Sequence, residues 1–336
     1  MELIKGENTR IMIASEDITF VVQGAIDKIN TSLCLSSIKK HFKNSKIILS
    51  TWEGSDVEGL DYDELILNKD PKGFKFSDKF YDNTNRQIVS SINGLRSVKT
   101  KYACKVRSDI ILLSNSFLKF FDKFSKRSNS YILYKKRVLT YIFSCKFKHL
   151  DEYTPFHVGD WIFFGLTEDL IKMYDISLIA EKDAAFYNGF PKSAPIRFYK
   201  NPQKYFPEQY ICYKPLEKNI CNIGFQNRFY NDENIINISN EFIANNYIIL
   251  SNFQMPIYFA KKNRNEYCNL DYEYFNNAID YYDWLELYKK YCNKTFRYPK
   301  YKKKIYKKII RIIYKNKHIK TFIQNYYKKL ILQYKR

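Results

Sequence analysis

The stretch KYACKVRSDIILLSN, residues 101–115, decides the fold class because its composition is that of a buried strand. Apolar residues lie on both sides of a polar centre formed by Arg107, Ser108 and Asp109. A buried charge without a partner is costly, so the arginine and the aspartate must either pair with each other or serve a ligand. We therefore expect a central strand that carries a polar group at its end.

Strand-like and helix-like segments alternate in the first third of the chain. Short β-branched or apolar runs predict strands at residues 18–26, 46–52, 63–68 and 102–113. Apolar residues at helical spacing predict one helix around residues 33–42 and another over residues 84–98, where Thr84 and Gln87 have the spacing of a capping box. This order is typical of an α/β fold with a mostly parallel sheet and helices on both faces.

Polar residues stand at the end of each predicted strand. They are Gln23–Gly24, Trp52–Glu53–Gly54, Lys69–Asp70 and Arg107–Ser108–Asp109. Ligands of open α/β sheets bind at the carboxyl ends of the strands, so we expect these four groups to converge on one crevice.

Several blocks of sequence, taken together, resemble a known family. They are VVQGAI, IILSTWEGSDVEGLDYDELILNKDPKGF, NTNRQIVSSINGL, KYACKVRSD and HVGDWIFFGLTEDL. Their order resembles the nucleotide-binding half of a GT-A glycosyltransferase, and more closely the WavE family of lipopolysaccharide-synthesis proteins, over residues 18–215. The resemblance implies glycosyl transfer from a nucleotide-sugar donor to a glycan or lipid-linked glycan of the bacterial surface.

The resemblance assigns the polar strand end at residues 107–109 to the donor diphosphate. GT-A enzymes usually carry an Asp-x-Asp motif there, which holds a divalent cation. This chain has Arg107 in place of the first carboxylate, so Asp109 alone would hold Mg²⁺ or Mn²⁺ while Arg107 contacts phosphate. Because Arg107 replaces the first carboxylate of the motif, the sequence leaves open whether the reaction depends on a metal ion. The structural alternative is a salt bridge between the two side chains.

Five further residues are candidates for the donor site. Glu53 stands where GT-A chains carry an acid that contacts the nucleoside, and Trp52 would form a wall of the cleft; alternatively, this segment is a simple turn and Trp52 is core. Gln23, beside Gly24, has donors and acceptors that suit a nucleobase edge. Arg86 opens the helix over residues 84–98, where a phosphate would gain from both the guanidinium and the helix end, or where the arginine is simply solvated.

Two carboxylates are candidates for the base that takes the proton of the acceptor hydroxyl. Asp160 precedes the strand predicted at residues 162–164, with His157 nearby, and Glu208 follows Pro207 at a predicted helix start. An inverting transfer needs such a base. The sequence does not decide between them, and in a retaining transfer the leaving diphosphate itself would take the proton.

The chain is predicted to have three regions: residues 1–215 as the donor and catalytic region, 216–296 as its completion on the acceptor side, and 297–336 as a basic tail. The tail carries 15 of the 56 basic residues and no acid, which leaves 41 basic and 35 acidic residues in the body. Ile305, Ile309, Ile312 and Ile313 lie on one side of the tail among lysines. This pattern favours an anionic membrane surface over nucleic acid, the alternative being a helix packed on the body.

Two broader expectations follow. The N-terminus MELIKGENTR lacks a signal peptide, no run approaches the length of a membrane span, and the seven cysteines include no CxxC pair, so we expect a reduced, cytoplasmic chain peripheral to the inner face of the cytoplasmic membrane.

The alternatives to a glycosyltransferase are a non-catalytic binding protein on a nucleotide-binding fold and a sugar-nucleotide nucleotidyltransferase. The latter is disfavoured because no glycine- and lysine-rich loop follows the first strand.

Overall fold

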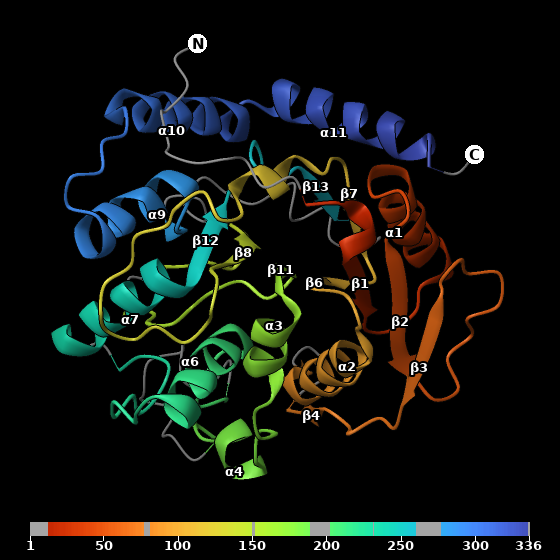
Figure 1. Cartoon of the computed structure of the whole chain (residues 1–336), viewed down its shortest axis with the longest axis horizontal. Coiled ribbons are helices and arrows are strands. Elements are labelled where there is room, and N and C mark those ends of the chain that lie inside the picture. The colour runs from red at the N-terminus through yellow and green to blue at the C-terminus, as the bar shows by residue number, and fades with distance from the viewer. Residues whose placement is uncertain are drawn as a thin grey trace.

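A seven-stranded sheet forms the centre of the protein (Figure 1). The computed structural model describes residues 13–76, 81–149, 152–188, 202–230, 232–259 and 277–334. In spatial order the strands are β12 (Tyr247–Leu250), β8 (Val138–Tyr141), β11 (Ile162–Leu166), β6 (Tyr102–Arg107), β1 (Ile18–Gln23), β2 (Lys46–Trp52) and β3 (Glu64–Asn68). All neighbouring strands are parallel except where β11 pairs with β6 and β8. The predicted α/β fold with a mostly parallel sheet is confirmed, and it is consistent with the GT-A-like fold that the resemblance implies.

Helices cover both faces of this sheet. Helix α1 (Lys28–His41) crosses from β1 to β2, and α2 (Thr84–Ser97) leads from the β3 side back to β6. Because such crossovers are right-handed, the two helices lie on opposite faces. Helix α3 (Thr167–Tyr174) packs against α2 on the same face. The apolar residues that predicted α1, including Leu35 and Ile38, are buried in the main core.

The remaining elements surround this centre. In the first half of the chain they are η1 (Ser15–Asp17), β4 (Phe74–Lys75), β5 (Tyr81–Asp82), β7 (Ile110–Leu112), η2 (Ser116–Phe120), β9 (Lys148–His149) and β10 (Glu152–Tyr153). In the second half they are α4 (Glu181–Ala184), α6 (Pro207–Asn219), α7 (Glu233–Asn246), β13 (Ile257–Phe259), α9 (Tyr281–Leu287), η3 (Tyr288–Cys292), α10 (Lys300–Lys315) and α11 (Lys317–Leu332).

The structure corrects two local predictions. The strand predicted over residues 102–113 is split, because the chain turns after Arg107 and β7 pairs with β13 in a separate ribbon. The Ser108 amide still donates to the carbonyl of Gln23 at 3.0 Å, which holds this turn against β1. The predicted capping box is also wrong, because Thr84 is already helical and its hydroxyl donates to Asp82 Oδ1 at 2.6 Å.

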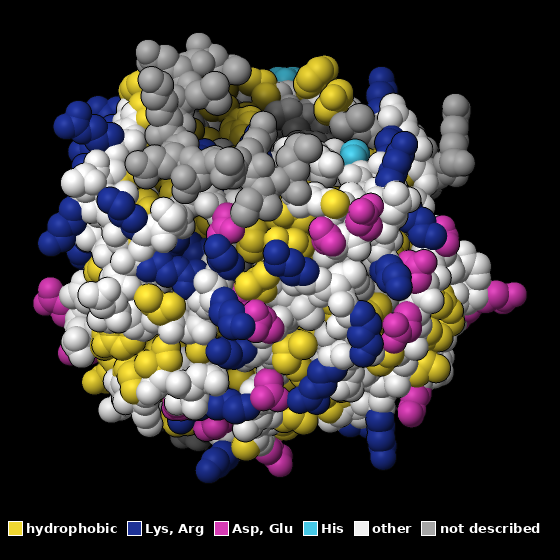
Figure 2. Space-filling model, in the orientation of Figure 1, with side chains coloured by type: hydrophobic (Ala, Val, Ile, Leu, Met, Phe, Trp, Pro, Cys, Tyr) yellow, Lys and Arg dark blue, Asp and Glu magenta, His cyan; other side chains and the backbone are white. Residues whose placement is uncertain are grey.

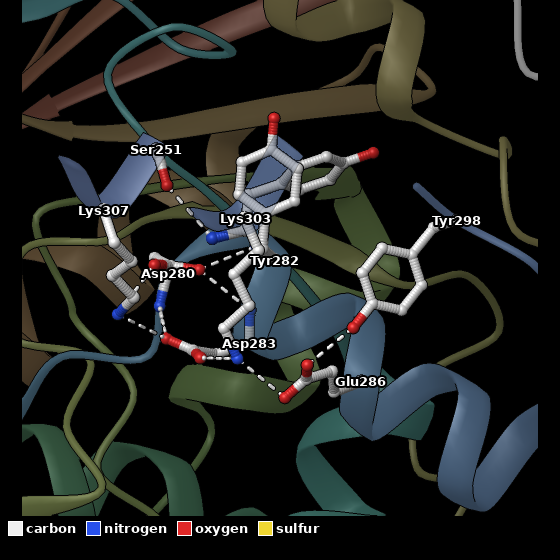
Figure 3. A network of polar contacts seen from close by, with 9 residues as sticks. Ser251, Asp280, Tyr282, Asp283, Glu286, Tyr298, Lys303 and Lys307 are labelled. Atoms are coloured by element: carbon white, nitrogen blue, oxygen red, sulfur yellow. Dashed lines mark hydrogen bonds and ion pairs between the residues drawn. The ribbon is translucent and has the colours of Figure 1, made fainter. Parts of the chain in front are cut away.

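The C-terminal helices lie end to end along one edge of the molecule (Figure 1). Helix α10 is held against α9 by ion pairs that Figure 3 shows together. Lys307 Nζ lies 2.9 Å from Asp280 Oδ2, and Lys303 Nζ lies 2.8 Å from Asp283 Oδ1 and 2.7 Å from Glu286 Oε2. One face of the tail therefore packs on the body, as the structural alternative for this segment expected.

The loop after β8 and the start of β11 touch at Gly159. A Cβ atom added at Gly159 would lie 1.9 Å from the backbone oxygen of Phe143, whereas one added at Gly165, within β11, would lie 3.3 Å from the Val138 side chain. Only a residue without a Cβ permits the first approach.

We expect Gly159→Ala to lower the free energy of unfolding by about 1–3 kcal/mol, because backbone atoms must move apart. Urea denaturation measures this loss, and Gly165→Ala is the matched control with a smaller effect. Equal stability of the two variants would contradict the close approach at Gly159.

Candidate active site

The antiparallel strand β11 brings its first residues to the edge of the sheet where the parallel strands end. Ile162 of β11 pairs with Val106 of β6, and Arg107 pairs with Gln23 of β1. The Arg107 amide donates to the carbonyl of Trp161 at 3.2 Å. Asp160, which precedes Trp161, therefore reaches the same edge as Gln23 and Arg107. Of the four strand ends expected to converge, those at Gln23 and Arg107 are direct neighbours in the sheet.

Arg107 and Asp109 form a two-bond ion pair at this edge. Arg107 Nε donates to Asp109 Oδ1 at 3.1 Å, and Nη2 donates to Oδ2 at 2.8 Å. The guanidinium also lies 5.3 Å from the ring centroids of both Trp161 and Phe259. The side chains are 26% and 13% exposed, so the pair is partly open to solvent. Two aromatic faces and a carboxylate thus hold the guanidinium in a defined position.

Asp160 is a buried carboxyl group with a fixed orientation. Its Oδ2 accepts a hydrogen bond from Gln87 Nε2 at 2.6 Å, and its backbone oxygen accepts one from the ammonium group of Lys105. Burial raises the pKa of Asp160, and the nearby charge of Glu208 raises it further, while Lys105, Gln87 and Arg107 oppose the shift. Asp160 and Glu208 are therefore close enough for their charges to interact.

Glu208 is the second residue of α6, directly after Pro207, as predicted. Burial of its carboxyl raises the pKa of Glu208, whereas the charge of Lys146, a hydrogen bond from Ser144 and the charge of Arg107 favour the ionised form. The residue is partly exposed, in contrast to Asp160. Because Arg107 acts on both carboxyls, these groups form one electrostatic unit.

Two other ionisable groups help to shape this cluster. Burial lowers the pKa of Lys105 to about 8, and its ammonium lies 5.5 Å from the Tyr174 ring centroid. His157 is buried, and its Nδ1 donates to the Ser144 carbonyl at 2.6 Å. Burial, together with the charge of Lys146, lowers the pKa of His157 to about 3, so the ring is neutral and holds the loop after β8.

The donor-side candidates lie along the same edge of the sheet. Gln23 is buried, and its Oε1 accepts from the Ser90 hydroxyl at 2.7 Å, so its amide oxygen is engaged by α2. Gly24 has φ +119°, a conformation that favours glycine. Trp52 is half-buried, and its carbonyl accepts from the Ser55 amide at 3.0 Å, which closes the turn that carries exposed Glu53.

Arg86 pairs with the end of β3. Its Nη2 lies 2.6 Å from Asp70 Oδ2, its Nε donates to Asp70 Oδ1 at 2.8 Å, and its Nη1 donates to Asn83 Oδ1 at 2.9 Å. The hydrogen bonds to Asp70 raise the pKa of Arg86. The structure thus links Arg86 to Asp70, another of the predicted strand-end residues.

Sequence reasoning missed four residues of the cluster. Gln87 was assigned to a capping box, although it orients Asp160. Lys105 could have been identified from the sequence, because a lysine inside a strand with buried neighbours needs a partner for its charge. Ser144 and Lys146 could not have been identified in this way, because the loop after β8 has no recognisable sequence pattern and only tertiary contacts bring it to Glu208.

The residues present do not make a ready metal site. Within the described residues there is no group of three or more histidine, cysteine or acidic side chains placed to hold a metal ion. Both carboxylate oxygens of Asp109 accept from Arg107, so a cation at Asp109 would have to share these oxygens with the guanidinium or displace it.

Comparison with known proteins identifies the family. The family model described as WavE lipopolysaccharide synthesis matches residues 18–318, so the chain belongs to this family and takes part in lipopolysaccharide synthesis. A search of curated proteins finds no significant match. In the part of the chain that the structure describes, no helix has the length and apolar character needed to cross a bilayer.

The raised pKa of Asp160 predicts a pH-dependent stability difference. Because its pKa is higher in the folded state, folding takes up a proton, and the wild-type free energy of unfolding falls as pH rises above the unfolded carboxyl pKa of about 4. The Asp160→Asn variant has no ionisable carboxyl at this position, so its free energy of unfolding does not fall with pH for this reason. We therefore expect the variant to gain stability relative to wild type as the pH rises above about 4.

Urea titrations at several pH values measure this difference. Asp175→Asn is a control of opposite sign, because hydrogen bonding to Lys218 lowers the pKa of exposed Asp175. That variant should lose relative stability with rising pH, by a small amount. A pH-independent difference for Asp160→Asn would show that its carboxyl is not held in a charge-disfavouring site.

Proposed function

We propose that the protein is a glycosyltransferase that uses a nucleotide-diphosphate-sugar donor to extend a lipopolysaccharide or other surface glycan. The observation that carries this proposal is the pairing of two carboxyls of raised pKa with a fixed guanidinium at the carboxyl edge of the sheet. A guanidinium suits a diphosphate, and a carboxyl group whose pKa is raised suits proton removal from a hydroxyl. Membership of a lipopolysaccharide-synthesis family supports the same reaction class.

Arg107 is the proposed diphosphate ligand. Its guanidinium is partly exposed at the strand end, and Trp161 and Phe259 limit its movement. The negative charge that develops on the leaving diphosphate would be stabilised by this cation. Asp109 positions Arg107. If Mg²⁺ or Mn²⁺ takes part, Asp109 is the expected ligand, after a change of partner.

The nucleoside would extend from Arg107 toward β1 and β2. Neighbouring strands are about 5 Å apart, so the ends of β1 and β2 lie within the span of a nucleoside diphosphate. Gln23, Gly24, Trp52 and Glu53 stand at these ends. Arg86, with Asp70, would bound the far side of the donor.

Glu208 is the proposed base of an inverting reaction, and Asp160 is its neighbour. Lys146 and Arg107 favour the ionised form of Glu208, and the charge of Glu208 raises the pKa of Asp160. Glu208 is also the more exposed of the two. An acceptor hydroxyl would give its proton to Glu208, its oxygen would bond to the anomeric carbon, and the bond from that carbon to the diphosphate oxygen would break.

The acceptor is proposed to be a glycan or lipid-linked glycan at the inner face of the cytoplasmic membrane. The support is the basic C-terminal tail, whose cations are suited to anionic lipid. A membrane-peripheral position would bring the enzyme to an acceptor that cannot leave the bilayer.

We expect Glu208→Gln to lower the transfer rate at least about a hundredfold, because the acceptor proton loses its base. Glycosyl transfer is measured with candidate nucleotide-sugar donors and a membrane fraction as acceptor. Glu168→Gln is the matched control, because Glu168 also lies in the first turn of a helix but is exposed and pairs with Lys135. Full activity of Glu208→Gln would remove this residue as the base.

We expect Arg107→Ala to weaken nucleotide diphosphate binding by about tenfold or more, because a charge-assisted contact to phosphate is lost. Calorimetry with and without Mn²⁺ measures the binding and its metal dependence. Arg96→Ala is the matched control, since Arg96 makes an exposed pair with Asp175.

We also expect Asp109→Asn to abolish transfer without unfolding the chain. Undiminished turnover would exclude Asp109 from the site. If Arg107→Ala lowers thermal stability but leaves nucleotide binding unchanged, the ion pair with Asp109 is structural only.

A further inference from the structure

Helix α10 turns an apolar stripe away from the protein. Tyr301, Ile305, Ile309 and Ile312 follow one another at intervals of four, four and three residues and are 60%, 51%, 38% and 47% exposed. Side chains at this spacing share one side of a helix. Isoleucine rarely stays this exposed along a whole helical stripe, since burying each one would stabilise the protein.

The opposite side of α10 explains why this stripe faces outward. Tyr306 and Ile310 are each only 5% exposed, and they pack on the main core. Lys303 and Lys307 lie on the same inner side and pair with the acidic group Asp280, Asp283 and Glu286 of the α9 region (Figure 3). Rotation of α10 to bury the isoleucines would break these ion pairs and leave Asp280, which is 1% exposed, without its cation.

Helix α11 continues the outer surface along the same edge of the molecule (Figure 1). Phe322 is 72% exposed and Tyr326 is 55% exposed, four residues apart. The far end of α11 is anchored, because Ile331 packs with Leu33 and Ile111, and the Tyr334 hydroxyl lies 2.8 Å from His41 Nε2. Both helices are thus attached to the body, and both present apolar side chains outward.

Cations surround the outward apolar side chains. Lys304, Lys308, Arg311 and Lys315 are exposed on α10. The last 40 residues carry 15 lysines or arginines and no acid. An anionic surface therefore meets no repulsion along either helix.

We propose that the outer face of α10 and α11, formed by Tyr301, Ile305, Ile309, Ile312, Phe322 and Tyr326 with their flanking cations, lies flat on an anionic phospholipid bilayer. The isoleucines and aromatic rings enter the interfacial region, and the lysines contact the headgroup phosphates. This inference deepens the proposed function by naming the docking surface, and it rests on that proposal only for the choice of bacterial lipids.

Lipid fits this face better than nucleic acid does. Nucleic acid offers phosphates but no apolar phase for three exposed isoleucines. On the face shown in Figure 2, basic and acidic side chains are interspersed over the described part of the body. The combination of apolar stripe and cations is what an interfacial helix requires.

The test uses the full chain, because truncation before α10 would remove the cations that pair with Asp280 and Asp283. Binding is measured by vesicle co-sedimentation with phosphatidylglycerol–phosphatidylethanolamine vesicles, with phosphatidylcholine vesicles for comparison. The test variant combines Ile305→Gln, Ile309→Gln and Ile312→Gln. The matched control combines Ile29→Gln, Leu67→Gln and Ile132→Gln, which are 55%, 49% and 43% exposed elsewhere on the body.

We expect the test variant to lose vesicle binding by at least about tenfold, and the control variant to bind as the wild type does. A second variant with Lys304→Gln, Lys308→Gln and Lys315→Gln should lose most of its preference for anionic over neutral vesicles, and wild-type binding should fall steeply with salt. Unfolding midpoints in urea for all variants confirm that the fold is kept.

Three outcomes would overturn the inference. They are equal vesicle binding by the wild type and the isoleucine variant, a wild-type dimer in light scattering that only this variant dissociates, and binding to duplex or single-stranded nucleic acid as strong as to vesicles. Nucleotide diphosphate binding is measured on the same samples. Retained nucleotide binding without vesicle binding would reject the docking surface and leave the proposed reaction standing.

Discussion

The antiparallel pairing of β11 with β6 is the constraint on which the candidate site depends. In a purely parallel sheet, the start of a strand lies at the opposite edge from the strand ends that bind ligands. Because β11 runs against its neighbours, Asp160 enters the sheet beside Arg107. A shift of one residue in this register would exchange the two faces of β11, and Phe163 and Phe164, each buried on its own face, would have to repack. The register of β11 with β6 therefore determines both the packing of β11 and the position of the Asp160 carboxyl.

The site places several charges where water cannot reach them fully. Lys105 and Asp160 are buried, and Arg107 and Asp109 are partly exposed. Each of these groups has a polar partner. Lys105 donates to the backbone oxygen of Asp160, and Gln87 donates to its carboxylate. Arg107 forms an ion pair with Asp109. Such a network is costly to assemble compared with an apolar core, and clusters of perturbed ionisable groups are typical of functional sites. The His157 ring belongs to the scaffold of this network, since its neutral form holds the carbonyl of Ser144.

The C-terminal helices show how polar contacts can determine which side of an amphipathic helix faces water. Hydrophobic burial alone would favour the side of α10 that carries Ile305, Ile309 and Ile312 as its inner side. The body instead offers three carboxylates from the α9 region, and one of these, Asp280, also caps α9 through the amides of Tyr282 and Asp283. Lys303 and Lys307 satisfy these carboxylates, and the aromatic ring of Tyr306 fills the remaining contact with the core. As a result, the three isoleucine side chains face away from the body of the protein.

Local patterns were enough to predict the α/β architecture, the strands over residues 46–52 and 63–68, and the residue types at the strand ends, because periodicity and turn composition are local properties. It also identified Asp160 and Glu208 as candidates from their positions beside a strand and a helix start. Contacts between distant segments establish that these two carboxyls interact, that Gln87 orients Asp160 instead of capping α2, and that Arg107 donates to both oxygens of Asp109. The split between β6 and β7 and the outward face of α10 were likewise tertiary outcomes. The reason is physical: pKa shifts, ion-pair partners and the exposed side of a helix depend on segments far apart in the chain, whose meeting no local pattern records.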